Sequence, residues 1–234
     1  QQKETVSEIL KKRAEASDCS YREADLSRFL VEKEDYHGIR FSYKEYKNLR
    51  GSLAGECQIA NLATALEVIR TLNALGISVP ETAVRKGLEE TRWPGRFTFL
   101  MEHPVFLVDG AHNEDGVEKF VETAVHFQKD YPLTLLFSAV DDKDYTDMIR
   151  TILGKISFHH VIVTQVGGYR KVPAEKLAEI FREKGCPTAE ACEDVEEAFK
   201  KALAAKGEDG MLFCIGSLYL VGEIKTLILQ GVGK

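Results

Sequence analysis

A short apolar run that ends in polar residues constrains this chain more than any other feature. Residues 105–108 read Val-Phe-Leu-Val, and residues 109–113 read Asp-Gly-Ala-His-Asn and lead into a helical pattern. Open α/β proteins place ligand sites where a buried strand delivers polar groups at its carboxyl end. Just upstream, residues 93–96 (Trp-Pro-Gly-Arg) add a stiff turn and a cation suited to phosphate. Together the two motifs predict a ligand site.

The pattern of elements changes at Arg96. After it, strand-like apolar runs alternate with helical patterns, and strands separated by about 10–15 helical residues indicate βαβ units. We therefore expect an α/β fold, a Rossmann-like, mainly parallel sheet flanked by helices, over residues 96–234. Residues 1–95 predict an α+β segment. Its expected elements are a helix over 4–18, a short strand over 20–25, strands near 29–31 and 39–43, a helix from 55 to about 76 and a helix from 81. The last helix is expected to have a capping box at Ser78 and to turn Ala83, Val84 and Leu88 inward.

Composition excludes several classes of protein. The formal charge of -6 argues against a surface that coats nucleic acid, although a local group of donors can still bind an anion. No apolar stretch approaches the roughly 18 residues of a membrane span, and no secretory signal is visible. The five cysteines form no Cys-x-x-Cys pair, so neither a zinc site nor a disulfide framework is indicated. We expect a cytoplasmic protein with no metal site in this chain, no nucleic-acid partner and no membrane contact.

The residue types after position 108 suit a ligand site. Asp109 can accept hydrogen bonds from ribose hydroxyls or from a basic partner, and Gly110 lets the backbone approach a ligand closely. His112 can donate to an anionic oxygen. Asn113 can cap the following helix. Spacing alone favours a simpler interpretation, an Asp/Asn turn that only starts a helix. The Trp-Pro-Gly-Arg motif in isolation likewise favours an ordinary interdomain turn in which Arg96 is a surface residue.

Three further groups lie at expected element ends. Gln58 and Asn61 share a face at the start of a helix, where two amides can contact a purine or phosphate, but capping or solvent-exposed amides fit equally well. Residues 141–144 (Asp-Asp-Lys-Asp) suit a metal or a substrate amine, with a solvated loop slightly favoured. Ser217 opens the last helix in an anion-friendly geometry, and simple N-capping is the alternative.

In order and spacing, these motifs resemble the folylpolyglutamate synthase/dihydrofolate synthase branch of the Mur ligase superfamily. The Asp-Lys-Asp and Gly-Ser-Leu-Tyr-Leu motifs favour this branch over others. The matching motifs are Gly55-x-x-Gln58-x-x-Asn61, Arg92-Trp-Pro-Gly-Arg96, Leu107-Val-Asp-Gly-Ala-His-Asn113, Asp142-Lys-Asp144 and Gly216-Ser-Leu-Tyr-Leu-Val-Gly-Glu223.

The resemblance implies an ATP-dependent amide ligase. In this family ATP phosphorylates a folate or dihydropteroate carboxylate, and the amine of L-glutamate attacks the acyl phosphate. The resemblance implies that Asn61, Arg96 and Asp109 contact ATP, that His112 is a catalytic and substrate-binding residue, and that Ser217 lies on the glutamate side. Residues 1–95 would be the end of the central ATPase domain, and residues 96–234 the C-terminal glutamate-ligase domain of a monomeric enzyme.

This sequence departs from the family pattern in several places. Cys57 stands where the family usually has His, and Glu114 where it usually has Pro. The phosphate loop is absent, since Gly154-Lys155 is followed by Ile156, and we expect the magnesium ligands upstream as well. Together with the initial Gln1, this indicates a piece of a longer protein. The alternatives are another Mur-type amino-acid ligase, such as a cell-wall precursor enzyme, and a non-catalytic nucleotide-binding or interaction module with the same fold.

Because the phosphate loop is missing, we expect this chain to be inactive as a ligase by itself. The purified 234-residue chain is expected to show no ADP release that depends on both ATP and L-glutamate when a folate acceptor is present. A coupled ADP assay measures this directly, and turnover above a heat-denatured control would contradict the prediction.

Overall fold

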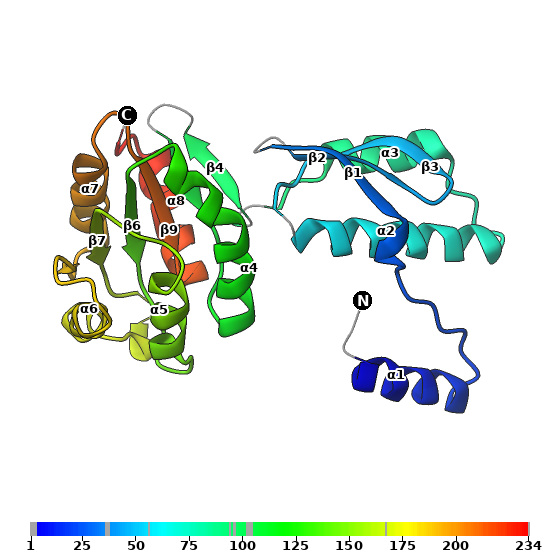
Figure 1. Ribbon diagram of the computed structural model, residues 1–234, viewed down its shortest axis with the longest axis horizontal. Coiled ribbons are helices and arrows are strands. Elements are labelled where there is room, and N and C mark those ends of the chain that lie inside the picture. The colour runs from blue at the N-terminus through cyan, green and yellow to red at the C-terminus, as the bar shows by residue number, and fades with distance from the viewer. Residues whose placement is uncertain are drawn as a thin grey trace. The chain divides into compact units, whose positions relative to one another are not determined.

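The computed structural model describes residues 4–35, 38–55, 57–93, 95, 97–101, 105–166 and 168–233. The chain divides into two compact units, Gln1–Arg92 and Trp93–Lys234 (Figure 1). Each unit has its own sheet and its own apolar core. We therefore describe each unit by itself.

Unit 1 is a small antiparallel sheet packed against two helices. The core side of the sheet carries Ile39, Phe41 and Leu49, and the helices α2 and α3 add Leu66 and Val84. The sheet order is β1-β2-β3. In chain order the elements are α1 (Glu4–Ala16), η1 (Leu26–Arg28), β1 (Phe29–Asp35), β2 (Gly38–Tyr43), β3 (Tyr46–Gly51), α2 (Cys57–Ala74) and α3 (Glu81–Glu90).

Two local expectations for unit 1 are wrong. Residues 20–25 form no strand, because Asp25 instead caps η1 by accepting from the Ser27 amide, and its own amide donates to the Tyr43 hydroxyl at 3.0 Å. The capping box at Ser78 is also absent, since α3 has Pro80 at its N-cap without a side-chain hydrogen bond. The Glu81 carboxylate instead forms an ion pair with Arg85 at 2.5 Å. Ala83 is exposed, whereas Val84 is buried and Leu88 partly buried, as expected.

Unit 2 is a six-stranded sheet flanked by helices. The strand order is β4-β5-β9-β6-β7-β8, and every neighbouring pair is parallel except β4 with β5. This confirms the expected Rossmann-like, mainly parallel α/β fold. In chain order the elements are β4 (Thr98–Met101), β5 (Phe106–Val108), α4 (Glu114–Ala124), η2 (Val125–Lys129), β6 (Leu133–Phe137), α5 (Tyr145–Leu153), β7 (His160–Val163), η3 (Gly168–Arg170), α6 (Ala174–Glu183), β8 (Glu190–Ala191), α7 (Val195–Lys206), β9 (Met211–Ile215) and α8 (Leu218–Leu229).

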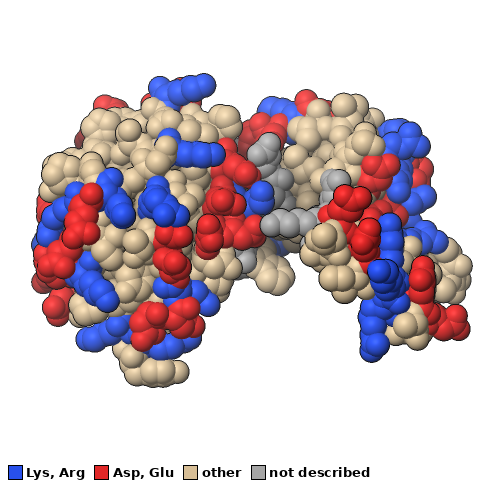
Figure 2. Space-filling model, turned by 60° about the horizontal axis from the view of Figure 1, so that its bottom comes forward, with Lys and Arg blue, Asp and Glu red and all other residues tan. Residues whose placement is uncertain are grey.

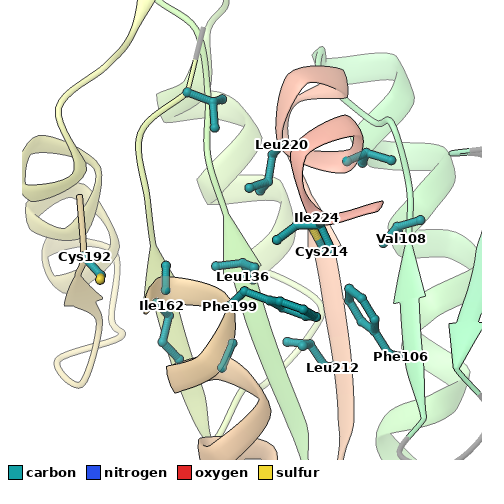
Figure 3. Packing of buried hydrophobic residues seen from close by; sticks show 14 residues of the cluster. Phe106, Val108, Leu136, Ile162, Cys192, Phe199, Leu212, Cys214, Leu220 and Ile224 are labelled. Atoms are coloured by element: carbon teal, nitrogen blue, oxygen red, sulfur yellow. The ribbon is translucent and has the colours of Figure 1, made fainter. Parts of the chain in front are cut away.

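The central strands are apolar on both faces because helices cover both. All residues of β6 and β9 are buried. Figure 3 shows Phe106, Leu136 and Cys214, from three adjacent strands, beside Phe199 of α7 and Ile224 of α8. Complete burial raises the pKa of the Cys214 thiol far above its ordinary value, so this side chain packs as a small apolar group.

The last strand of the chain, β9, lies in the middle of the sheet between β5 and β6. The connection through α7 therefore runs in the opposite direction to those through α4, α5 and α6, and α7 packs beside α8 whereas α4 packs beside α5. A reversal of this kind is the switch point at which open α/β sheets bind ligands, at the carboxyl ends of the strands.

Acidic and basic side chains are interspersed over the surface seen in Figure 2. Within the described ranges, none of the helices combines the length and the apolar character needed to cross a lipid bilayer. The large apolar side chains are instead concentrated in the two cores.

Gly216 makes the turn from β9 into α8 in a conformation that other residues rarely adopt. Its φ is 101°, and a Cβ atom there would lie 2.2 Å from the carbonyl oxygen of Ser138. A backbone atom cannot yield as a flexible side chain can, so both the strain and the clash require glycine here.

The substitution Gly216→Ala is expected to destabilise the protein by about 2 kcal/mol or more, because it combines positive-φ strain with backbone overlap. Gly222→Ala in α8 is the matched control, since nothing lies within 4 Å of its added methyl group. It is expected to stabilise by up to about 1 kcal/mol through helix propensity. Urea unfolding measures both changes, and equal free energies of unfolding for the two variants would refute the argument.

Candidate functional site

Four loops of unit 2 meet at the carboxyl edge of the parallel sheet. The loop after β9 is joined to the loop after β5, because the Gly216 amide donates to the Ala111 carbonyl at 2.9 Å. It is joined to the loop after β6 by the Ser138 amide, which donates to Ile215 at 3.4 Å. The loops after β6 and β7 are joined by the Asp141 amide, which donates to Arg170 at 2.9 Å. The switch point is therefore built from hydrogen-bonded loops.

Asp109 binds backbone amides with both carboxylate oxygens. Its Oδ1 accepts from the Ala111 amide at 2.7 Å, and its Oδ2 accepts from the Phe97 amide at 2.6 Å. The side chain is only 7% exposed, and Phe97 has a positive φ of 40°. The sequence analysis expected Asp109 to face a ligand. The structure shows that Asp109 holds Phe97, the residue immediately before β4, against the end of β5.

Gly110 is required by two close neighbours. Its amide donates to the Gly95 carbonyl at 2.6 Å. A Cβ atom at this position would lie 2.4 Å from Cδ2 of Leu218 and 3.0 Å from the Gly95 oxygen. The sequence analysis expected Gly110 to let the backbone approach a ligand; in the structure the close neighbours that require glycine are Gly95 and Leu218 of the chain itself.

His112 has one ring nitrogen engaged. Its Nδ1 lies 2.6 Å from the Gly110 carbonyl oxygen, and the side chain is half-buried. Because a carbonyl oxygen only accepts, Nδ1 carries the proton in this contact, and the neutral ring then offers Nε2 as an acceptor. His112 therefore donates from Nε2 to an anion only when the ring is protonated.

Both helix caps that the sequence predicts at this edge are present. The Asn113 side chain accepts from the Gly116 amide at 2.9 Å and caps α4. The Ser217 hydroxyl is buried and accepts from the Tyr219 amide at 3.2 Å, so it caps α8. The structure brings Asp109, His112 and Ser217 to one edge, although Ser217 has a structural partner of its own.

The sequence analysis missed Arg170, which connects three loops. One terminal amine donates to Asp142 at 3.2 Å, and the other donates to the Tyr219 hydroxyl at 2.5 Å. The guanidinium also lies against the rings of Tyr169 and Tyr219. The neighbouring Tyr219 and then Asp142 raise its pKa, so it stays charged. The sequence places Arg170 in the loop that follows the apolar run of β7, which is the one feature that could have marked it as a site residue. The sequence does not reveal its distant partners Asp142 and Tyr219.

Two polar atoms at this edge have no hydrogen-bond partner among the described residues. They are the Ser138 hydroxyl oxygen and the Nε atom of Arg170, and both atoms are buried. An unmade hydrogen bond at a buried polar atom costs about 1–3 kcal/mol. Such atoms are consistent with a site that is completed by water or a ligand.

The two remaining sequence candidates are Asn61 of unit 1 and Arg96. Asn61 is exposed in the first turns of α2 in unit 1, and its amide donates to the buried Gln58 at 3.0 Å. The two amides therefore contact each other, as their spacing suggests. Arg96 lies outside the described residues. In the described ranges, no three His, Cys, Asp or Glu side chains are grouped to hold a metal ion.

Residues 95–218, more than half of the chain, match the family model described as "Mur ligase, glutamate ligase domain". The chain belongs to this family. The matched range includes Asp109, His112, Arg170 and Ser217 of the carboxyl edge described above. The sequence-based resemblance to the Mur ligase superfamily is thus confirmed.

Curated relatives carry folate-ligase names. The chain is 32% identical to the dihydrofolate synthase/folylpolyglutamate synthase of Bacillus subtilis over 80% of its length and 44% of the relative. It is 28% identical to the folylpolyglutamate synthase of Lacticaseibacillus casei, over 87% of this chain and 47% of the relative. This Mur-ligase chain spans about half the length of the curated relatives it matches.

Solved structures agree with the fold. The folylpolyglutamate synthase of Thermotoga maritima has a TM-score of 0.79 and 28% identity, and the match covers 98% of this chain and 53% of that chain. The folylpolyglutamate synthase of Mycobacterium tuberculosis, complexed with ADP, has a TM-score of 0.82 and 25% identity, over 100% and 54% of the two chains.

Asp109→Asn is expected to destabilise unit 2 by about 1–3 kcal/mol, because an amide keeps only one acceptor and sets an NH₂ group against a backbone N–H. The Phe97 or Ala111 amide would lose its partner, which NMR detects as a local shift change and faster hydrogen exchange. Asp130→Asn, at an exposed site, is the control and is expected to change the free energy of unfolding by less than about 0.5 kcal/mol. Equal effects of the two substitutions would contradict the proposed stabilising role of the Asp109 hydrogen bonds to Phe97 and Ala111.

Proposed function

We propose that this chain supplies the glutamate-ligase part of an ATP-dependent, ADP-forming ligase that joins L-glutamate to a folate or dihydropteroate carboxylate. The observation that carries the proposal is the switch-point edge, where the Asp109 loop lies beside the start of α8 within the matched family domain. The names of the relatives support the folate class, and the ADP-bound neighbour supports a nucleotide. Residues 1–95 are assigned to the end of the central ATPase domain and residues 96–234 to the glutamate-ligase domain.

The proposed ATP contacts are Asn61, Arg96 and Asp109. Two backbone amides hold the Asp109 carboxylate in place, so it would meet a ribose hydroxyl in a preorganised position. The same bonds hold Phe97, while the Gly95 carbonyl is held by Gly110. Both neighbours of position 96 are thereby held in place, and a guanidinium group at that position suits a phosphate.

The proposed glutamate side consists of His112 and the start of α8 at Ser217. Helix N-termini favour anions, so α8 suits a carboxylate of L-glutamate. With its Nδ1 bonded to Gly110, neutral His112 can accept at Nε2 a proton from the ammonium group of L-glutamate. The freed amine then forms the C–N bond at the acyl phosphate carbon, and the C–O bond to phosphate breaks. No described residue is assigned to the magnesium that would accompany ATP.

A chimera tests this function. This chain is joined to the portion of the Bacillus subtilis relative that it does not cover, and glutamate-dependent ADP release is measured with dihydropteroate, with tetrahydrofolate and with a muramoyl-peptide acceptor. Turnover with either pterin-containing acceptor supports the proposal and identifies the preferred substrate. Turnover with the muramoyl peptide alone would assign the domain to a cell-wall ligase. ATP binding without turnover on any acceptor would favour the non-catalytic module.

In the active chimera, His112→Gln is expected to lower kcat by about 10²–10⁴-fold, the usual contribution of a general base. KM for ATP is expected to change little. His159→Gln is the matched control, because His159 is exposed just before β7, away from the strands' carboxyl ends. Equal kcat values for the His112 and His159 variants would contradict the role of His112 as general base.

A further inference from the structure

Unit 1 carries a row of three cations across its antiparallel sheet. Lys33 of β1 is directly opposite Arg40 of β2, and Arg40 is directly opposite Arg50 of β3. Residues directly opposite each other project from the same face of a sheet. All three side chains are exposed, whereas Ile39 and Leu49, next to them in sequence, are buried. The row therefore lies on the face turned away from the core.

This arrangement is unfavourable for the protein alone. Like charges directly opposite each other on neighbouring strands destabilise a sheet. Lys33 has a partner, Asp35, at 2.8 Å. Among the residues that the structure describes, neither Arg40 nor Arg50 forms an ion pair with a carboxylate. Two adjacent guanidinium groups are thus left without a counter-charge.

The row lines a shallow hollow of about 220 Å³. Among the described residues, the rest of the lining consists of Asp35, Gly38 and Ile39, so three cations face one carboxylate, which forms an ion pair with Lys33. The described lining therefore carries two more positive than negative charges, although the formal charge of the chain is -6. The positive potential is therefore local to the hollow.

We propose that this hollow binds a small polyanion whose charges are phosphoryl or carboxylate groups. Guanidinium groups bind both through two parallel hydrogen bonds. Cross-strand neighbours lie about 5 Å apart at their Cβ atoms, which lets Arg40 and Arg50 each take one of two adjacent charged groups. The site consists only of unit 1 residues and does not depend on the proposed ligase activity.

The test is an NMR titration of the chain with ¹⁵N-labelled arginine. Inorganic pyrophosphate and citrate are the two probes, and sodium chloride at equal ionic strength is the blank. Saturable shifts of the Arg40 and Arg50 Nε signals are expected with at least one probe. The tighter probe identifies phosphoryl or carboxylate as the preferred chemistry. Shifts that follow ionic strength alone, with no saturation by either probe, would overturn the proposal.

Matched variants separate the site from general charge. The double variant Arg40→Gln/Arg50→Gln is expected to weaken binding of the tighter probe at least tenfold. Lys12→Gln/Arg13→Gln removes the same charge from exposed positions of α1, and it is expected to change the affinity less than twofold. Equal losses in the two double variants would show only non-specific attraction and would refute the site.

A stability measurement gives an independent readout. Without anion at low salt, Arg50→Gln is expected to raise Tm, because it removes the repulsion from Arg40. With saturating probe, the same variant is expected to melt below the wild-type chain, because it has lost a ligand contact. A substitution that shifts Tm in the same direction under both conditions would contradict the proposal.

Discussion

The architecture of unit 2 depends on the two parallel ladders that hold β9 in the middle of the sheet. Leu212 is paired with Phe106 on one side and with Thr134 on the other, so residues far apart in the chain become neighbours. Such non-local pairings are completed late, because loop closure precedes the contacts that reward it. The loops after β5 and β6 therefore take their positions from a strand near the end of the sequence.

Asp109 connects the central strand β9 to backbone segments outside the parallel part of the sheet. Its own amide donates to Cys214 of β9, and its oxygens accept from Ala111 and Phe97. A single residue thus connects the central strand, the loop after β5 and the segment before β4. A role in holding backbone and a role in ligand binding do not exclude each other, since a preorganised carboxylate is more effective toward a ligand than a mobile one.

Sequence patterns predict the parts of this fold that have local causes. The apolar runs of β6 and β9 and the caps at Asn113 and Ser217 are visible because burial and N-capping leave a mark within a few residues. The insertion of β9 between β5 and β6 leaves no such mark. The role of Arg170 was missed for the same reason, because Tyr219 lies far along the chain. Residues 20–25 were misjudged because a side-chain cap at Asp25 outweighs a weak strand preference.

A lysine or arginine side chain that already forms an ion pair with a carboxylate is less available to bind an anionic ligand. In unit 1, Lys44 and Arg70 both donate to the buried Glu67. Burial alone would raise the pKa of Glu67, but these cations and the Tyr43 hydroxyl lower it below its ordinary value, so the carboxylate stays ionised. Lys44 and Arg70 are thereby engaged in structural ion pairs, as Arg170 is with Asp142 in unit 2. Arg40 and Arg50 lie on the sheet face turned away from the core. Neither pairs with a carboxylate among the described residues, so their charge remains available to a ligand.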